Sequence, residues 1–235
     1  MNLRREPGGR PLVIGHRGAA AVAPENTRAS LEAAVAAGVD LVEFDISPGL
    51  RLGHSAAEFP ADELSLDEAL ELLAARDVGL QLDVKLPGYE PEVLDAIERH
   101  GVGERALVST AFAATSRRVA EIAPGFPVAI GYPRDRLGVS NLRWPRPLQR
   151  TGAAALRRAM PARVPVLLRW SRANTLSLHH TLCSPAAVAT ARRLGAPVFA
   201  WTVNDPESVR KVTAAGVDGI VSDDPEMTLA TLLAL

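Results

Sequence analysis

The sequence predicts an α/β protein folded as a TIM (β/α)8 barrel, and three observations point to it. Short hydrophobic segments typical of buried strands alternate with helical segments along the chain. The links between these segments are short, and no long linker separates two regions. The length of 235 residues is near that of one such barrel and small for two α/β domains. We therefore expect residues 1–235 to form a single domain.

The first strand and helix are predicted near the N-terminus. Val13–Gly15 is typical of a short buried strand because two β-branched residues precede a glycine. A helix is expected over Arg28–Ala37, where Leu31 and Val35 are four residues apart. Gly38 follows at a position suited to end this helix.

The second strand is predicted over Val39–Ile46. Its alternation places Leu41, Glu43 and Asp45 on one face and apolar residues on the other. Leu50–His54 is expected to return as a short strand. A polar face so close to a strand end makes this region a candidate site.

The same alternation continues to the C-terminus. Ser65 and Glu68 form a predicted capping box that opens the next helix, which extends to about Arg76. Further strands are predicted at Val78–Leu86, Ala106–Thr110, Pro127–Gly131, Val164–Leu168, Thr175–His179, Pro197–Val203 and Gly219–Ser222. Further helices are predicted at Pro91–His100, Ala114–Ile122, Gln149–Arg158, Ser184–Leu194, Glu207–Ala215 and Glu226–Leu233. Loops are predicted through Pro60 and Asp62 and over residues 143–147, and Asp223 and Asp224 are expected to cap the last helix.

Composition and charge narrow the class of protein. Hydrophobic residues make up 47% of the chain and charged residues 23%, as in ordinary globular proteins. A net charge of −1 gives no footprint for nucleic acid or for an anionic membrane. Cys183 is the single cysteine, which excludes an intrachain disulfide and a CxxC redox or zinc site. Residues 1–9 lack the apolar region of a signal peptide, and we expect a cytoplasmic protein without stable membrane insertion.

Polar side chains gather at the predicted carboxyl ends of the first strands, which converge on one face of a barrel. These side chains are His16, Arg17, Glu43, Asp45, His54, Asp83 and Lys85. Three carboxylates from two neighbouring strands offer the oxygen ligands preferred by a divalent cation such as Mg²⁺ or Ca²⁺. Alone, Glu43 and Asp45 would fit a solvated strand face, and the recurrence of the pattern at Asp83 favours a metal site.

The basic and titratable residues of this group suggest phosphate chemistry. Arg17 and Lys85 are predicted to bind a substrate phosphate beside the metal. His16 and His54 are candidates for general acid and base because imidazole titrates near neutral pH. The alternative is a polar first strand whose His16 and Arg17 cap a helix or face solvent. Lys85 and Lys211 are the only lysines, and all other Lys and Arg positions are arginines. A lysine at position 85 therefore suggests a specific role for that residue.

Six short motifs follow one another along the chain. They are Gly15-His16-Arg17-Gly18, Pro24-Glu25-Asn26-Thr27, Glu43-Phe44-Asp45, Asp83-Val84-Lys85, Trp201-Thr202-Val203-Asn204 and Gly216-Val217-Asp218-Gly219-Ile220-Val221-Ser222-Asp223-Asp224-Pro225. In this order they resemble the glycerophosphodiester phosphodiesterase family, over almost the whole chain, and most closely a bacterial-type member with a short insertion. The first two motifs together with the last two are specific, whereas each alone would be weak.

The resemblance implies a barrel of the PLC-like phosphodiesterase type that hydrolyses glycerophosphodiesters to glycerol 3-phosphate and an alcohol with a divalent metal ion. It implies His16 and His54 as the catalytic pair, Glu43, Asp45 and Asp83 as ligands of Mg²⁺ or Ca²⁺, and Arg17 and Lys85 as phosphate-binding residues. Trp201 would form an apolar wall of the substrate pocket, with an ordinary core aromatic as the alternative. Asn26 would form hydrogen bonds near the metal site.

Two departures from the family pattern bear on substrate and metal preference. Ser55 follows His54 where the family usually has aspartate, and the segment 49–64 is shorter than usual. Asp83 stands where the family usually has glutamate, so its carboxylate is one methylene closer to the backbone. A lysophospholipase D-like activity and a barrel that binds phosphodiesters without turnover stay open as alternatives, as do the alcohol released and the oligomeric state.

Overall fold

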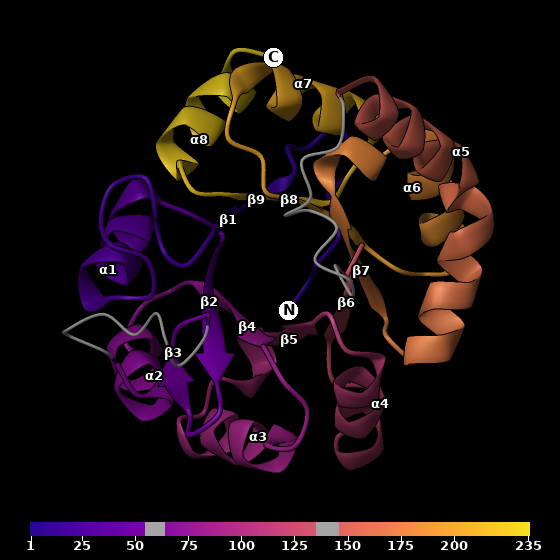
Figure 1. Ribbon diagram of the computed structural model, residues 1–235. Coiled ribbons are helices and arrows are strands. Elements are labelled where there is room, and N and C mark those ends of the chain that lie inside the picture. Colours follow the sequence, from indigo (N-terminus) through magenta and orange to yellow (C-terminus); the bar gives the residue numbers. More distant parts are fainter. Residues whose placement is uncertain (55–63, 135–145) are drawn as a thin grey trace.

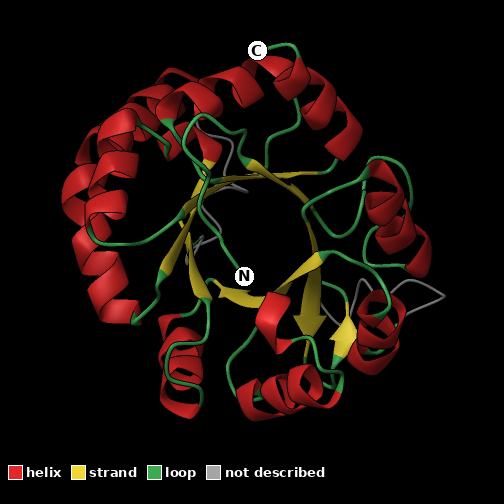
Figure 2. Ribbon diagram, turned by 180° about the vertical axis from the view of Figure 1, so that it is seen from behind, coloured by secondary structure: helices red, strands yellow, loops and turns green. Residues whose placement is uncertain are grey.

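The computed structural model of the protein describes residues 1–54, 64–134 and 146–235. Within these residues eight parallel strands form a closed barrel, with helices on its outside (Figures 1 and 2). The strand order is β1-β9-β8-β7-β6-β5-β4-β2, and pairing of β1 with β2 closes the ring. The predicted TIM barrel is therefore confirmed. Ser55 and the predicted loop through Pro60 and Asp62 lie outside the described residues.

The barrel strands are β1 (Leu12–Gly15), β2 (Leu41–Ser47), β4 (Gly79–Val84), β5 (Ala106–Thr110), β6 (Val128–Tyr132), β7 (Thr175–His179), β8 (Val198–Trp201) and β9 (Gly219–Ser222). The short strand β3 (Arg51–Leu52) returns antiparallel to β2, as predicted. The helices are α1 (Arg28–Ala37), α2 (Leu66–Ala74), α3 (Glu90–Arg99), α4 (Ala113–Ile122), α5 (Arg146–Ser171), α6 (Pro185–Arg193), α7 (Pro206–Ala215) and α8 (Pro225–Leu233). In the described residues, 3-10 turns cover Gly103–Arg105 and His180–Leu182.

One predicted strand is wrong. Residues Val164–Leu168 belong to the long helix α5, together with the helix predicted at Gln149–Arg158 and the end of the predicted loop over 143–147. Met160, Val164 and Leu168 recur every four residues and are buried against the barrel. Val166, which a strand would place on the same face as Val164, is 66% exposed. Burial at every fourth residue therefore favours a helix here, although β-branched residues and prolines disfavour helix formation.

Apolar side chains fill two layers. The larger layer lies between the strands and the surrounding helices and includes Val42, Phe44 and Ile46 of β2. A smaller cluster contains Leu41 with residues of β1, β5, β6, β8 and β9. Because side chains alternate along a strand, Leu41 shares its face with the two acidic residues of β2, which lie farther along it. Apolar residues thus fill one end of the barrel interior and leave its carboxyl end polar.

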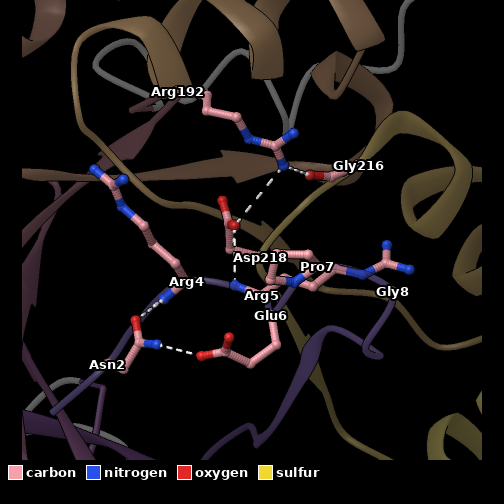
Figure 3. Close-up of a pocket in the computed structure, with 9 residues that line it drawn as sticks. All are labelled: Asn2, Arg4, Arg5, Glu6, Pro7, Gly8, Arg192, Gly216 and Asp218. Carbon is pink, nitrogen blue, oxygen red and sulfur yellow. Dashed lines mark hydrogen bonds and ion pairs between the residues drawn. The ribbon is translucent and has the colours of Figure 1, made fainter.

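The N-terminal segment 1–9 lies at the amino ends of the barrel strands, and both ribbon views place the N-terminus at the centre of the ring. Leu3 is buried in the inner apolar cluster. The Met1 ammonium donates to the Glu104 carbonyl at 2.8 Å, and the Arg5 amide donates to Asp218 at 3.1 Å. The segment also lines a hollow of about 560 Å³, shown in Figure 3. These contacts indicate that residues 1–9 close the end of the barrel opposite the candidate site.

We expect Leu3→Ala to lower the free energy of unfolding by about 2–3 kcal/mol, because it opens a cavity in the inner cluster. Chemical denaturation followed by circular dichroism measures this change. Leu233→Ala is the matched control, since Leu233 is 85% exposed and its truncation is expected to change stability by less than about 0.5 kcal/mol. Equal stabilities of the two variants would contradict the closing role of the segment.

No helix in the described part of the chain is long and apolar enough to cross a membrane.

Candidate active site

A cavity of about 280 Å³ opens at the carboxyl ends of the barrel strands. Of the predicted site residues, His16, Arg17, Glu43, His54, Asp83, Lys85 and Trp201 line it. Asp45 lies directly beneath, fully buried and bonded to the residues of the wall. The structure thus brings every predicted site residue to one place. Gln81, Ser109, Thr110, Arg134 and Ser177 also line the cavity, and these residues were not predicted.

The loop after β1 owes its shape to glycine. Arg17 and Gly18 both adopt positive φ angles, of 51° and 86°. A Cβ atom on Gly18 would lie 2.4 Å from the backbone carbon of Ser30, and one on Gly15 would lie 2.4 Å from the Gly18 oxygen. These glycines therefore let the loop pack on itself and on α1, which positions His16 and Arg17 at the cavity.

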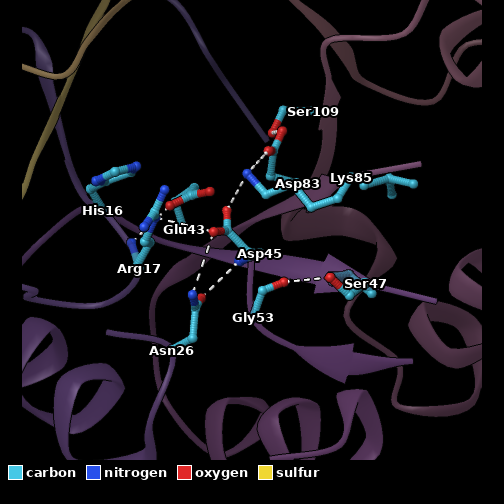
Figure 4. A network of polar contacts seen from close by, with 12 residues as sticks. His16, Arg17, Asn26, Glu43, Asp45, Ser47, Gly53, Asp83, Lys85 and Ser109 are labelled. Atoms are coloured by element: carbon cyan, nitrogen blue, oxygen red, sulfur yellow. Dashed lines mark hydrogen bonds and ion pairs between the residues drawn. The ribbon is translucent and has the colours of Figure 1, made fainter. Parts of the chain in front are cut away.

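Three carboxylates meet at the floor of the cavity. Asp45 of β2 is in register with Asp83 of β4, and Glu43 precedes Asp45 on the same face. One oxygen from each of Glu43, Asp45 and Asp83 lies within 4.8 Å of the other two. Figure 4 shows them converging from the two neighbouring strands. A set of hard oxygen donors at this spacing fits a divalent cation such as Mg²⁺ or Ca²⁺, and Asp83 reaches the cluster although it is shorter than glutamate.

Two cations lie against this cluster. The Lys85 ammonium is 2.5 Å from an oxygen of Asp45 and 2.5 Å from an oxygen of Asp83. The Arg17 Nε is 3.1 Å from Asp45, and its Nη1 donates to both oxygens of Glu25 at 2.6 Å. Burial lowers the pKa values of Arg17 and Lys85, but the charge of Asp45 beside Arg17, and those of Asp83 and Asp45 beside Lys85, outweigh it and leave both pKa values raised, so both groups stay charged. They are placed to bind a negatively charged ligand beside the carboxylates.

Neutral side chains orient the carboxylates from behind. Asn26, at the turn before α1, accepts from the Asp45 amide at 2.9 Å and donates to its side chain at 3.4 Å. Ser109 of β5 donates to Asp83 at 2.7 Å and accepts from Gln81 at 3.1 Å. The hydrogen bonds of Asn26 beside the predicted metal ligands agree with the sequence prediction, whereas Ser109 carried no motif that would have identified it.

The crowding of charge changes the protonation of Glu43. Burial and the charge of Asp45 raise the pKa of Glu43 to about 7. The Arg17 amide donates to this carboxyl at 2.8 Å. In the pH range between 4.5 and 7, the folded metal-free protein therefore holds a proton that the unfolded chain has released. The stability contributed by this group is lost as pH rises through that window.

In EDTA, we expect Glu43→Gln to gain stability relative to the wild type as pH rises from 5 to 8, by on the order of 2 kcal/mol. Glutamine keeps the shape of the side chain and cannot ionise. Denaturation at both pH values measures the difference. At pH 8, excess Mg²⁺ is expected to stabilise the wild type more than the variant. A stability difference independent of pH would contradict the raised pKa.

His16 has a partner that the sequence prediction missed. Its Nδ1 lies 2.5 Å from an oxygen of Asp223, at the end of β9, the strand beside β1. Burial lowers the pKa of His16, but the hydrogen bond to Asp223 and the charge of Glu43 outweigh it and leave the pKa above its ordinary value. Asp223 was expected to cap the last helix. The cap is Asp224 alone, which accepts from the Met227 amide at 2.9 Å.

His54 is held at the rim of the cavity by β2. Ser47 donates to the Gly53 carbonyl at 2.6 Å, and the Gly53 amide donates to the Asp45 carbonyl at 3.1 Å. Trp201 ends β8 on another part of the wall, and the ring of His179 contacts it edge-on at 5.3 Å between centroids. The predictions that His54 and Trp201 reach the site are consistent with these positions.

A sequence model of the glycerophosphoryl diester phosphodiesterase family matches residues 16–47 and 66–227. The match begins at His16 and includes Glu43, Asp45, Asp83 and Lys85. It omits residues 48–65, between β2 and α2.

Proteins of similar sequence and structure cover nearly all of the chain. A glycerophosphodiester phosphodiesterase of Caldanaerobacter subterraneus is 25% identical over 94% of this chain and 97% of its own. The crystal structure of a glycerophosphodiester phosphodiesterase from Parabacteroides distasonis has a TM-score of 0.74 at 18% identity, covering 96% of this chain and 98% of that one. An Oleispira antarctica phosphodiesterase, solved with its product sn-glycerol-3-phosphate, has a TM-score of 0.71 at 21% identity, covering 94% and 96%.

Proposed function

Because this chain belongs to the glycerophosphoryl diester phosphodiesterase family and is thus a phosphoric diester hydrolase, we propose that its cavity converts glycerophosphodiesters to glycerol 3-phosphate and an alcohol with a divalent cation. One observation supports the substrate class and the use of a divalent cation. A buried carboxylate cluster, two paired cations and two histidines surround the same cavity. The adjacent hollow, which His16 and Arg17 also border, is not lined by Glu43, His54, Asp83 or Lys85.

The cation would be held by Glu43, Asp45 and Asp83. When bound, it would polarise the phosphoryl group and offset its charge. Arg17 and Lys85, which lie against the carboxylates, would contact the phosphate oxygens. Charged donors fixed in a site that excludes water stabilise charge more strongly than they would in solution. Ser109 and Asn26 would hold Asp83 and Asp45 in place.

Proton transfer is assigned to His16 and His54, one protonating the leaving alcohol and the other taking a proton from the nucleophile. Asp223 occupies Nδ1 of His16, which leaves Nε2 for this transfer. His54 is exposed at the rim, where an alcohol can depart. The two histidines come from different strands and so can lie on different sides of a bound diester.

The size of the cavity favours a small substrate. Its volume of about 280 Å³ is at the lower end of the range for ligand pockets. A diester with a short alcohol matches this volume, whereas the acyl chain of a lysophospholipid would have to leave the part of the cavity formed by the described residues. Trp201 supplies an apolar surface at one side for the glycerol or the alcohol.

Product analysis tests the proposal. With Mg²⁺ present, glycerophosphocholine and glycerophosphoethanolamine are expected to yield glycerol 3-phosphate in amounts equal to the choline or ethanolamine released. Lysophosphatidylcholine is expected to react at least about tenfold more slowly. Release of choline from the lysophospholipid alone would show that lysophospholipids, and not glycerophosphodiesters, are the substrate class. If the folded protein releases nothing from any of the three compounds, the barrel would be assigned to phosphodiester binding without turnover.

A further inference from the structure

We propose that Asp223 and Asn204 are a positioning pair that fixes His16 in the tautomer with its proton on Nδ1, so that Nε2 faces the reacting oxygen. The inference rests on the catalytic role proposed above for His16. Neither residue belonged to the predicted site, and neither lines the main cavity. Both border the adjacent hollow of about 440 Å³, whose wall His16 and Arg17 share.

The contact between Asp223 and His16 is built into the barrel. His16 and Asp223 directly follow the paired strands β1 and β9, and the His16 amide donates to the Ser222 carbonyl at 2.9 Å. This backbone bond sets the two side chains side by side, with Nδ1 and Oδ1 2.5 Å apart. An ionised carboxylate can only accept hydrogen bonds, so the proton of a neutral His16 lies on Nδ1.

Asn204 holds the aspartate from its other side. Its Nδ2 donates to Oδ2 of Asp223, and its Oδ1 accepts from the Asp223 amide at 3.0 Å. Asp223 is thus bonded through both carboxylate oxygens. Burial alone would raise the pKa of Asp223, but the hydrogen bond and charge of His16 and the amide of Asn204 lower it below the ordinary value. The carboxylate therefore stays ionised at neutral pH.

Because the Asn204 amide is fixed, the positioning role of Asp223 can be tested by replacing one carboxylate oxygen with an NH2 group. In Asp223→Asn, the new side chain has one oxygen and one NH2 group. Asn204 donates toward the Oδ2 position, so the new oxygen settles there and the new NH2 group faces His16. An NH2 group can only donate, so His16 must accept through Nδ1 and carry its proton on Nε2, the wrong nitrogen for catalysis. Loss of the correct tautomer in this way disables a Ser-His-Asp triad with its geometry intact.

We expect Asp223→Asn to lower kcat for glycerol 3-phosphate release by about 10²-fold, within the range that a positioned acid or base contributes, with KM changed by less than about threefold. Adding Asn204→Ala to this variant lets the new amide turn its oxygen to His16, and at least about fivefold of kcat is expected to return. Asp224→Asn is the matched control, because Asp224 only caps α8 and asparagine caps a helix equally well. Its kcat is expected to equal that of the wild type.

Nitrogen-15 NMR of the imidazoles at pH 9 reads the tautomer without an activity assay, with His16→Gln identifying the resonance. We expect the Nδ1–H form in the wild type and the Nε2–H form in Asp223→Asn. An unchanged tautomer, or an Asp223→Asn enzyme with the kcat of Asp224→Asn, would overturn the inference. If the wild type hydrolyses no diester, the proposed function fails, and the tautomer measurement still decides whether Asp223 and Asn204 position His16.

Discussion

Asp45→Asn is expected to lower kcat/KM for glycerol 3-phosphate release by on the order of 10³-fold, because it removes the central charge of the site. Asp45 is fully buried and lies within 3.1 Å of Arg17 Nε and 2.5 Å of Lys85 Nζ. Asparagine has the same shape, but it leaves the carboxylate cluster with one negative charge fewer. Loss of metal-assisted charge stabilisation amounts to several kcal/mol, and about 1.4 kcal/mol corresponds to a factor of ten.

Steady-state kinetics at several Mg²⁺ concentrations measures this effect, and calorimetry measures binding of the cation itself. Asp67→Asn is the matched control, since Asp67 pairs with Arg99 and His100 on the outside of the barrel. Circular dichroism and thermal unfolding show whether both variants are folded. A folded Asp45→Asn enzyme within threefold of the wild type would contradict the assignment of Asp45 to the metal site.

His16→Gln and His54→Ala are each expected to lower kcat by about 10²- to 10⁴-fold, the usual contribution of a general acid or base. If the two groups serve one proton-transfer cycle, as proposed, the double variant is expected to lose much less than the product of the two single losses. His100→Ala is the control, since His100 ends α3 and contacts Asp67 outside the cavity. Single-turnover assays of the three variants with glycerophosphocholine measure the chemical step.

Each histidine has its own contradicting result. Full activity of His54→Ala would keep the hydrolase but remove His54 from the proposed acid–base pair, because its place in the cavity would then be incidental. A loss confined to KM in His16→Gln would assign His16 to substrate binding. Either outcome leaves the proposed role of the carboxylate cluster untouched, so the two predictions with the largest effects are independent of each other.

Much of the site could be predicted because its parts follow the rules of a parallel barrel. Side chains alternate along a strand, so Glu43 and Asp45 had to share a face, and parallel register then sets Asp83 beside Asp45. The residues that follow β1, β2 and β4 meet because carboxyl ends of barrel strands converge. These regularities depend on the alternation within each strand and on the order of strands and helices, and both can be predicted from the sequence.

The missed parts depend on contacts between distant residues. Asp223 precedes a helix, and a local reading assigned it to the cap, yet its partner His16 is 207 residues away. Ser109 supports Asp83 from a neighbouring strand and has no motif of its own. Helix α5 was divided because prolines and β-branched residues weaken the local helical signal, whereas burial of Met160, Val164 and Leu168 stabilises it. In α5, tertiary contacts overrode local propensity.

Metal dependence of glycerol 3-phosphate release by the wild type tests the central claim most directly. The protein is treated with EDTA, dialysed and assayed with glycerophosphocholine, first alone and then with added Mg²⁺ or Ca²⁺. We expect no release above background without metal and full recovery with at least one of the two cations. Release at the full rate in EDTA would contradict a cation held by Glu43, Asp45 and Asp83 as the basis of the activity.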